Sequence, residues 1–269
     1  PTRRSSDLCM EASLLAVAIM YGATAVLGNL ILDLYLMKKY PYVVPSVSKV
    51  KLSEMKSIAG LGILFFTMQI CSLVLNTTDN LLISRYFGAA DVTPYSTVNK
   101  LFRIIIQLHN IILTPMWSLY TEAKVRGDHA WMKKQLLRLT LLTGAFSIGA
   151  IILIFIFRPV ANLWLGRELV YTDSLIVFTA IYAILDIFAN VFNSFLCGVG
   201  YVKIPAIFAV IQSIINIPLS IIFAVNMNMG LSGIILGSVI SVAIPAAVDP
   251  IATLHWFRKN KEFARVEEN

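Results

Sequence analysis

The chain has few charged residues, although charged side chains are what keep the surface of a soluble domain in water. Asp, Glu, Lys and Arg make up only 14% of its 269 residues, whereas hydrophobic residues make up 58%. A typical soluble domain has about 25% charged residues. This composition excludes an ordinary soluble fold and indicates a protein that lies largely in lipid.

Cysteine, histidine and catalytic motifs are also scarce. The three cysteines and three histidines are scattered without CxxC spacing, so we expect no metal site, no disulfide framework and no cofactor. HExxH, GxSxG and P-loop patterns are absent from the sequence, and no long hydrophilic segment could form a catalytic domain. We therefore predict that the protein is not an enzyme.

Long apolar runs fill most of the sequence. A helix crosses a bilayer with roughly 20 apolar residues, and runs such as IGAIILIFIF do not alternate as the strands of a membrane barrel do. The sequence thus predicts an all-α membrane protein with about seven transmembrane helices. These spans lie at about 11–36, 58–83, 95–118, 137–157, 172–197, 204–226 and 230–254.

Lys and Arg concentrate in alternate connections between these spans. The basic connections are 37–57, 119–136 and the tail after residue 255. Because cytoplasmic loops are enriched in Lys and Arg, we expect these segments and the C-terminus of this multi-pass protein to be cytoplasmic. The net charge of +7 therefore reflects membrane orientation, and we expect no nucleic-acid partner.

The first eight residues, PTRRSSDL, do not resemble a targeting signal. They form a polar leader that is joined abruptly to an apolar span and contains no initiator methionine. We interpret residues 1–8 as a non-native leader and the chain as the C-terminal fragment of a longer transporter-like protein.

One face of the predicted span 95–118 is polar and charged. At 100° per residue, six polar residues fall within an arc of roughly 80°, while His109 points to the opposite side. Arg103 lies close to mid-membrane, where a charge costs at least about 2.5–3.5 kcal/mol. This face therefore predicts a wet or polar cavity. Its residues are Ser96, Lys100, Arg103, Gln107, Asn110 and Thr114.

Two interpretations of Lys100 and Arg103 remain open. Arg presents a planar fork that suits phosphate, and Lys adds a point charge nearby, so the pair could bind a phosphate or pyrophosphate head group. Alternatively, the two cations pair internally with Asp79 or Asp186.

Other spans repeat the polar pattern with amide side chains. Amides suit sugar hydroxyls because they donate and accept hydrogen bonds at once, although they also join helices to one another. The candidate amides are Asn76, Asn80, Asn190 and Asn193. Among the carboxylates, Asp186 is the better candidate for proton or cation coupling. Asp33 and Asp249 are predicted to lie at the membrane interface.

Several motifs resemble those of one transporter group. The segments are TTDNLLISRYFGAADVTPYSTVNKLF, LTPMWSLYTEAKVRGDHAWMKKQLLR, NSFLCGVGYVKIPAI and NMNMGLSGIILGSVIS. They resemble, respectively, the start of the second bundle, a helix end with a "GD" turn, a "G-x-x-K" turn and a late span. The group is the polysaccharide flippases (O-antigen, capsule or teichoic type) of the multidrug/oligosaccharidyl-lipid/polysaccharide exporter superfamily.

This resemblance implies twelve or more spans in two six-helix bundles. Residues 9–37 would then be the last helix of the N-terminal bundle, 38–57 a basic cytoplasmic linker, 58–255 the complete second bundle and 256–269 a cytoplasmic tail.

The resemblance also implies a function. A lipid-linked oligosaccharide would be moved across a bacterial-type cytoplasmic (inner) membrane by alternating access, for export of a surface polysaccharide. Lys100 and Arg103 would meet the pyrophosphate of a polyprenyl carrier, and the partners would be the glycan substrate, membrane lipids and glycan-assembly proteins. Asp79 matches the acidic residue of the family's "TD" pair. The alternatives are a drug/cation antiporter of the same superfamily and a membrane scaffold that does not transport.

Overall fold

The described part of the chain is helical throughout. The computed structural model describes residues 14–41, 52–166 and 168–267, and these ranges contain no strand. The elements are α1 (Leu14–Lys39), α2 (Leu52–Tyr86), α3 (Ala89–Val125), α4 (His129–Leu165), α5 (Asp173–Gly198), α6 (Lys203–Ile221), the π-helical turn η3 (Ile222–Asn226) and α7 (Leu231–Glu267).

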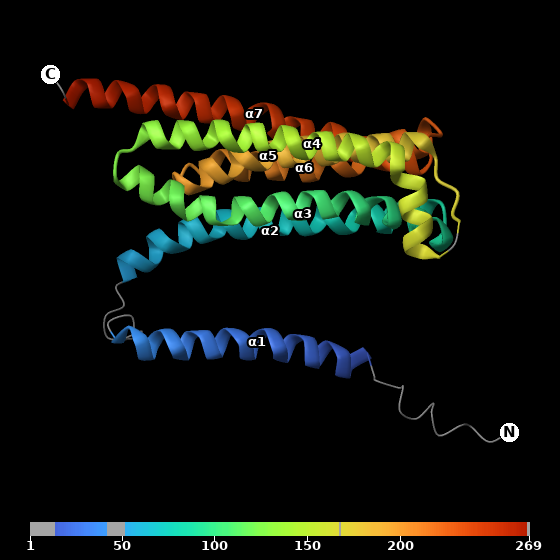
Figure 1. Cartoon of the computed structure of the whole chain (residues 1–269), viewed down its shortest axis with the longest axis horizontal. Helices are drawn as coiled ribbons and strands as arrows, with labels where there is room; N and C mark the ends of the chain where they lie inside the picture. The colour runs from blue at the N-terminus through green and yellow to red at the C-terminus, as the bar shows by residue number, and fades with distance from the viewer. Residues whose placement is uncertain (1–13, 42–51, 167, 268–269) are drawn as a thin grey trace. The chain divides into compact units, whose positions relative to one another are not determined.

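The chain divides into two compact units, Pro1–Ser57 and Ile58–Asn269. The first unit contains α1, whose described side chains are nearly all exposed. The second unit is a helix bundle in which α5 packs against α3, α4 and α7, and α6 packs against α7. Figure 1 shows α5 and α6 in the middle of this bundle, between α4 and α7 on one side and α2 and α3 on the other.

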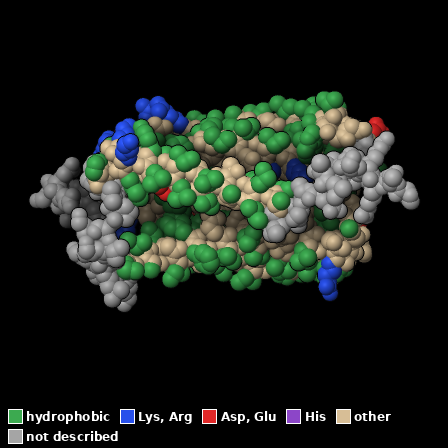
Figure 2. All heavy atoms as spheres, turned by 90° about the horizontal axis from the view of Figure 1, so that it is seen from below, with side chains coloured by type: hydrophobic (Ala, Val, Ile, Leu, Met, Phe, Trp, Pro, Cys, Tyr) green, Lys and Arg blue, Asp and Glu red, His purple; other side chains and the backbone are tan. Residues whose placement is uncertain are grey.

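Six described helices are long and apolar enough to cross a membrane. Hydrophobic side chains cover most of the face shown in Figure 2, and Lys and Arg lie toward its ends. The chain is therefore an all-α membrane protein. The helix α3 has 37 residues and is long enough to cross a membrane, but it is not among the six because its polar face lowers its mean hydropathy. It nevertheless packs against α4 and α5 in the same bundle. The six spans are Ile19–Lys39, Ile58–Tyr86, His129–Leu165, Asp173–Gly198, Lys203–Asn226 and Leu231–Asn260.

The predicted connection 119–136 is wrong in extent, because most of it is helical. The helix α3 continues to Val125, and α4 begins at His129. Only a short turn separates them. Gly127 adopts a left-handed conformation with φ of 70°, and the Asp128 side chain accepts a hydrogen bond of 2.9 Å from the Trp131 N–H. A glycine that tolerates positive φ and an N-terminal cap explain why so short a turn suffices.

Two other helices also begin earlier than predicted, so the connections before them are shorter. The helix α3 begins at Ala89 and tolerates Pro94 in its second turn, whereas the predicted span began at residue 95. The last six residues of the predicted linker, 52–57, belong to α2, which starts at Leu52. The leader 1–8 and linker residues 42–51 lie outside the described residues.

Two hydrophobic clusters fill the bundle along its length. In one cluster the rings of Phe102 and Phe157 stack with centroids 6.2 Å apart. In the other, Tyr120 meets Phe195 edge to face at 5.0 Å, and Phe195 meets Trp256 at 5.3 Å. Residues of α3, α4, α5 and α7 thus meet in each cluster, so these four helices form a rigid frame for the polar surfaces between them.

The helices α6 and α7 approach each other closely through two glycines. A Cβ at Gly233 would lie 2.5 Å from the Cα of Ala224, and a Cβ at Gly237 would lie 2.5 Å from the backbone N of Ser220. Small residues four apart allow helix backbones to pack at such distances in membranes. The two glycines therefore hold α7 against α6 and η3.

We expect Gly233→Ala to destabilise the protein, because its Cβ would overlap backbone that cannot rotate away. Overpacking of this kind costs about 1–3 kcal/mol. Thermal unfolding of the purified full-length protein measures the effect. Gly149→Ala in α4 is the matched control, since nothing lies within 4 Å of its Cβ. Equal melting temperatures for the two variants would contradict the tight contact.

Candidate functional site

The bundle encloses two adjoining pockets among α2, α3, α5, α6 and α7. Their volumes are about 290 Å³ and 680 Å³. They are continuous because both are lined by Leu75, Asn76, Arg103, Tyr182 and Gln212. We call the two together the cavity, the smaller part the narrow pocket and the larger part the wide pocket.

Nine of the residues singled out from the sequence as candidate cavity, coupling or ion-pair groups line this cavity, whereas Thr114 of the predicted polar face lines neither pocket. The narrow pocket has Asn76, Asp79, Asn80, Lys100 and Arg103 in its wall. The wide pocket has Asn76 and Arg103 again, and adds Gln107, Asp186, Asn190 and Asn193. The predicted polar face of α3 thus faces an open space.

The opposite face of α3 is buried, which explains how a helix with two exposed cations remains anchored. Leu101 and Phe102 belong to the hydrophobic core. His109 is fully buried, and its Nε2 lies 3.0 Å from the hydroxyl of Thr143 in α4. The helix is therefore apolar toward α4 and polar toward the cavity.

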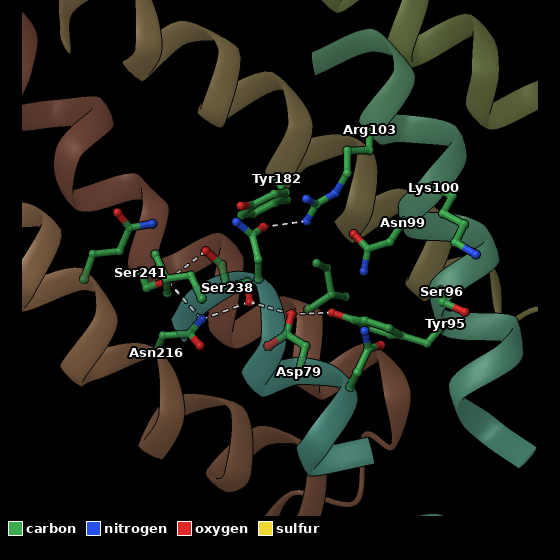
Figure 3. A pocket seen from close by; sticks show the side chains of 15 residues that line it. Asp79, Tyr95, Ser96, Asn99, Lys100, Arg103, Tyr182, Asn216, Ser238 and Ser241 are labelled. Atoms are coloured by element: carbon green, nitrogen blue, oxygen red, sulfur yellow. Dashed lines mark hydrogen bonds between the residues drawn. The ribbon is translucent and has the colours of Figure 1, made fainter. Parts of the chain in front are cut away.

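Arg103 contacts a neutral amide. Its Nη2 donates to Oδ1 of Asn76 over 2.6 Å, which joins α3 to α2 (Figure 3). Within the described residues, neither Arg103 nor Lys100 forms an ion pair with Asp79 or Asp186. Both cations are exposed to the cavity, so their charges are available to an anion.

Asp79 is buried in a hydrogen-bonded cluster. The hydroxyl of Tyr95 donates to Oδ2 of Asp79 over 2.5 Å, and the hydroxyl of Ser238 donates to the same oxygen over 3.3 Å. Asn216 donates through Nδ2 to Ser238 at 2.9 Å and to Ser241 at 3.2 Å. Figure 3 shows these side chains meeting from α2, α3, α6 and α7.

Two buried oxygens of this cluster lack a partner among the described residues, namely Oδ1 of Asp79 and Oδ1 of Asn216. Buried polar atoms are almost always hydrogen-bonded in native structures. The cluster can therefore accept one more donor or a small cation. No described group of three or more His, Cys, Asp or Glu residues could hold a metal ion.

The wide pocket is lined chiefly by amides and aromatic rings. Asp186 accepts a hydrogen bond of 3.1 Å from Nδ2 of Asn190. Oδ1 of Asn193 accepts a weak bond of 3.5 Å from the thiol of Cys197. At the far end, the rings of Phe65 and Trp117 lie 4.9 Å apart. Such a surface can hydrogen-bond hydroxyl groups and stack against the apolar faces of sugar rings.

Sequence reasoning missed the partners of Asp79. Tyr95, Ser238 and Ser241 were not among the candidates, although each lines the narrow pocket. The two serines are three residues apart in an apolar helix and therefore share a face. That spacing was the available signal, but nothing in the sequence indicated which helix they would meet.

Asp249 lies among the helices of the bundle. Its side chain is fully buried, and neither carboxyl oxygen has a partner among the described residues. The helix that carries it, α7, continues to Glu267. Asp249 is therefore an interior residue of the bundle.

Comparison with known proteins connects this cavity with a transporter family. The MatE family model matches residues 65–222. Two Salmonella proteins named as O-antigen transporters are similar, one from S. typhimurium with 26% identity over 182 residues and one from S. typhi with 23% over 233 residues. An O-antigen export protein of Yersinia pseudotuberculosis is 24% identical over 185 residues.

These matches cover 67%, 85% and 67% of this chain but only 42%, 52% and 41% of the relatives, in the same order. The chain therefore spans about half the length of the curated relatives. No solved structure matches it significantly. Because the family model covers more than half of the chain, and covers α3, α5 and the cavity-lining parts of α2 and α6, the chain belongs to the MatE family of membrane transporters.

Proposed function

We propose that the chain forms the second bundle of a flippase that moves a polyprenyl-pyrophosphate-linked oligosaccharide across the cytoplasmic membrane by alternating access. The observation that carries this proposal is the pair of cavity cations, Lys100 and Arg103, neither of which forms an ion pair with a described carboxylate. Charge at membrane depth is retained where it faces a wet cavity or a ligand. An anionic head group is the ligand that two neighbouring cations favour.

The rest of the cavity supports a glycan carried on that anion. Amide side chains from α2, α3 and α5 surround the wide pocket, and amides match the alternating donors and acceptors of sugar hydroxyls. The relatives named for O-antigen transport or export are consistent with such a cargo. Membrane lipids and glycan-assembly proteins would be the remaining partners.

Because the relatives are about twice as long, the whole transporter is part of the proposal. Residues 9–37 would be the last helix of a first bundle, 38–57 a cytoplasmic linker and 256–269 a cytoplasmic tail. The first bundle would complete the cavity from the side on which Arg103, Gln107 and Asn80 are exposed. Alternating access would then be a movement of the two bundles relative to one another, with the cavity between them.

We expect Arg103→Gln to abolish or strongly reduce export. A charge-assisted hydrogen bond to phosphate contributes about 1.5–3 kcal/mol, so affinity for a polyprenyl-pyrophosphate lipid should fall roughly 10- to 100-fold. Restoration of surface glycan in cells that lack the transporter, and lipid binding by the purified full-length protein, measure the effect.

The matched control is Arg126→Gln, because Arg126 is exposed, pairs with Glu122 and lies outside the cavity. Arg103→Lys should retain part of the affinity, since it keeps the charge but loses the planar fork. Full export and unchanged lipid binding by Arg103→Gln would contradict the proposed contact between Arg103 and the pyrophosphate, and with it the observation that carries the flippase proposal.

A substitution at Asp79 distinguishes the flippase from the second candidate function, a drug/cation antiporter. The antiporter is the second candidate because Oδ1 of Asp79 is buried, has no hydrogen-bond partner in the described part of the chain and could receive a cation. We expect Asp79→Asn, which can still accept the Tyr95 and Ser238 hydrogen bonds, to keep or increase affinity for the pyrophosphate lipid, since it removes a negative charge from the cavity.

Lipid binding and efflux of a cationic dye, measured in the same preparation of the full-length protein, distinguish the two candidates. The antiporter predicts dye efflux that Asp79→Asn abolishes, together with no pyrophosphate-lipid binding by the unmodified protein. Asp91→Asn, an aspartate in the first turn of α3 outside the cavity, is the matched control.

A further inference from the structure

Two aromatic rings meet at one end of the wide pocket. The ring of Phe65 in α2 and the ring of Trp117 in α3 have centroids 4.9 Å apart, and both side chains line the pocket. Trp117 is 41% exposed, although its side chain is large and mostly apolar. Ligand sites commonly combine aromatic side chains with a few placed polar groups. This exposed pair in the wall of a polar cavity is therefore a candidate ligand contact.

The two rings continue the polar faces of their helices. Trp117 follows Arg103 and Asn110 at intervals of seven residues, so the three side chains leave α3 on nearly the same side. Phe65 lies eleven residues before Asn76, which is close to three full turns of α2. All five side chains line the wide pocket. The aromatic pair thus belongs to the cavity wall and not to the outer surface of the bundle.

The helices α2 and α3 meet at two points along this wall. At one point Nη2 of Arg103 donates to Oδ1 of Asn76, and at the other Phe65 contacts Trp117. Fourteen residues of α3 separate Arg103 from Trp117, which at 1.5 Å per residue is about 21 Å. The wall between the two points is polar and uncharged, and it is made by Gln69, Ser72, Gln107 and Asn110.

The backbone that carries Trp117 is held firmly against α5. A Cβ at Gly198 would lie 2.8 Å from the carbonyl oxygen of Trp117, so no side chain separates the two helices there. The hydroxyl of Thr121 lies 2.7 Å from the Gly198 carbonyl oxygen and 3.1 Å from that of Trp117. A ring on a rigid support loses little conformational freedom when a ligand stacks on it, which favours binding.

The chemistry of the wide pocket suits a sugar chain better than a second anion or a lipid tail. Among its described lining residues, the charged ones are Arg103 and Asp186. Amides donate and accept hydrogen bonds at once, as sugar hydroxyls require. The electron-rich face of an aromatic ring attracts the weakly positive C–H groups on a face of a sugar. A hydrocarbon tail would instead leave the amides without hydrogen-bond partners.

We propose that Phe65 and Trp117 stack on a sugar that is remote from the lipid carrier, so that the wide pocket measures the length of the glycan. With the pyrophosphate at Arg103, the first sugar falls short of the aromatic pair, whereas a later sugar of a short oligosaccharide reaches it. The protein then prefers a carrier with an assembled oligosaccharide to one with a single sugar, and transport follows glycan assembly. The measurement rests on the proposed function, because it starts at the pyrophosphate, whereas the stacking site does not.

Binding of three synthetic lipids to the purified full-length protein tests the measurement. The lipids are a polyprenyl pyrophosphate with no sugar, with one hexose and with a linear chain of four hexoses. We expect the unmodified protein to bind the third lipid most tightly. Trp117→Ala should lower that affinity roughly tenfold, as truncation of a buried aromatic contact does, and should leave the other two affinities unchanged. Trp117→Phe should keep most of the affinity, because an aromatic ring remains.

The matched control is Trp164→Ala, which removes an exposed tryptophan outside the cavity and should leave all three affinities unchanged. Equal losses for the three lipids in Trp117→Ala, or a full affinity of this variant for the third lipid, would overturn the proposal. Equal melting temperatures of the variants would show that the losses do not come from misfolding.

The stacking site and the flippase fail in different ways. A free chain of four hexoses, without lipid or pyrophosphate, should change the tryptophan fluorescence of the unmodified protein and of Trp164→Phe, but not that of Trp117→Phe. This result in a protein that binds no pyrophosphate lipid would reject the flippase and retain the sugar site. Lipid binding that depends on Arg103 and is the same in Trp117→Ala as in the unmodified protein would do the reverse.

Discussion

The cost of placing charge inside a membrane is the constraint on which the rest of this structure depends. Arg103 and Lys100 lie on a helix that is apolar on its other face and packs against α4. A charge at that depth is unfavourable by at least about 2.5–3.5 kcal/mol unless water, a counter-ion or a ligand receives it. The bundle meets this requirement with a cavity whose nearest partner for Arg103 is the neutral amide of Asn76. Both cations are exposed, and within the described residues neither forms an ion pair with Asp79 or Asp186.

The polar cavity requires rigid packing elsewhere. Gly233 and Gly237 bring α7 into backbone contact with α6 and η3, and Gly198 brings α5 equally close to α3, where a Cβ would lie 2.7 Å from the Cβ of Tyr120. The contacts of Gly233 and Gly237 fix the helices that carry Ser238, which donates to Asp79, and Asn216, which donates to Ser238. The polar atoms of the cavity are thus positioned by close helix packing, since lipid provides no hydrophobic force between helices.

The sequence was sufficient for the fold class, the polar face of α3 and the grouping of polar spans around one space, because periodicity within a helix depends only on local geometry. It was not sufficient for contacts between distant segments. Ser238 lies 159 residues from Asp79, and no local pattern pairs them. Helix ends near 119–136 were missed because basic residues suit both loops and helix termini.

The most direct test of the account is a structure of the full-length protein in a lipid nanodisc with a polyprenyl-pyrophosphate lipid bound. The account predicts that the pyrophosphate lies in the cavity within hydrogen-bonding distance of Arg103 and Lys100, and that the guanidinium leaves Asn76 to meet it. A pyrophosphate bound elsewhere, or an Arg103 that turns to form an ion pair with Asp79 or Asp186 while the lipid is bound, would contradict it.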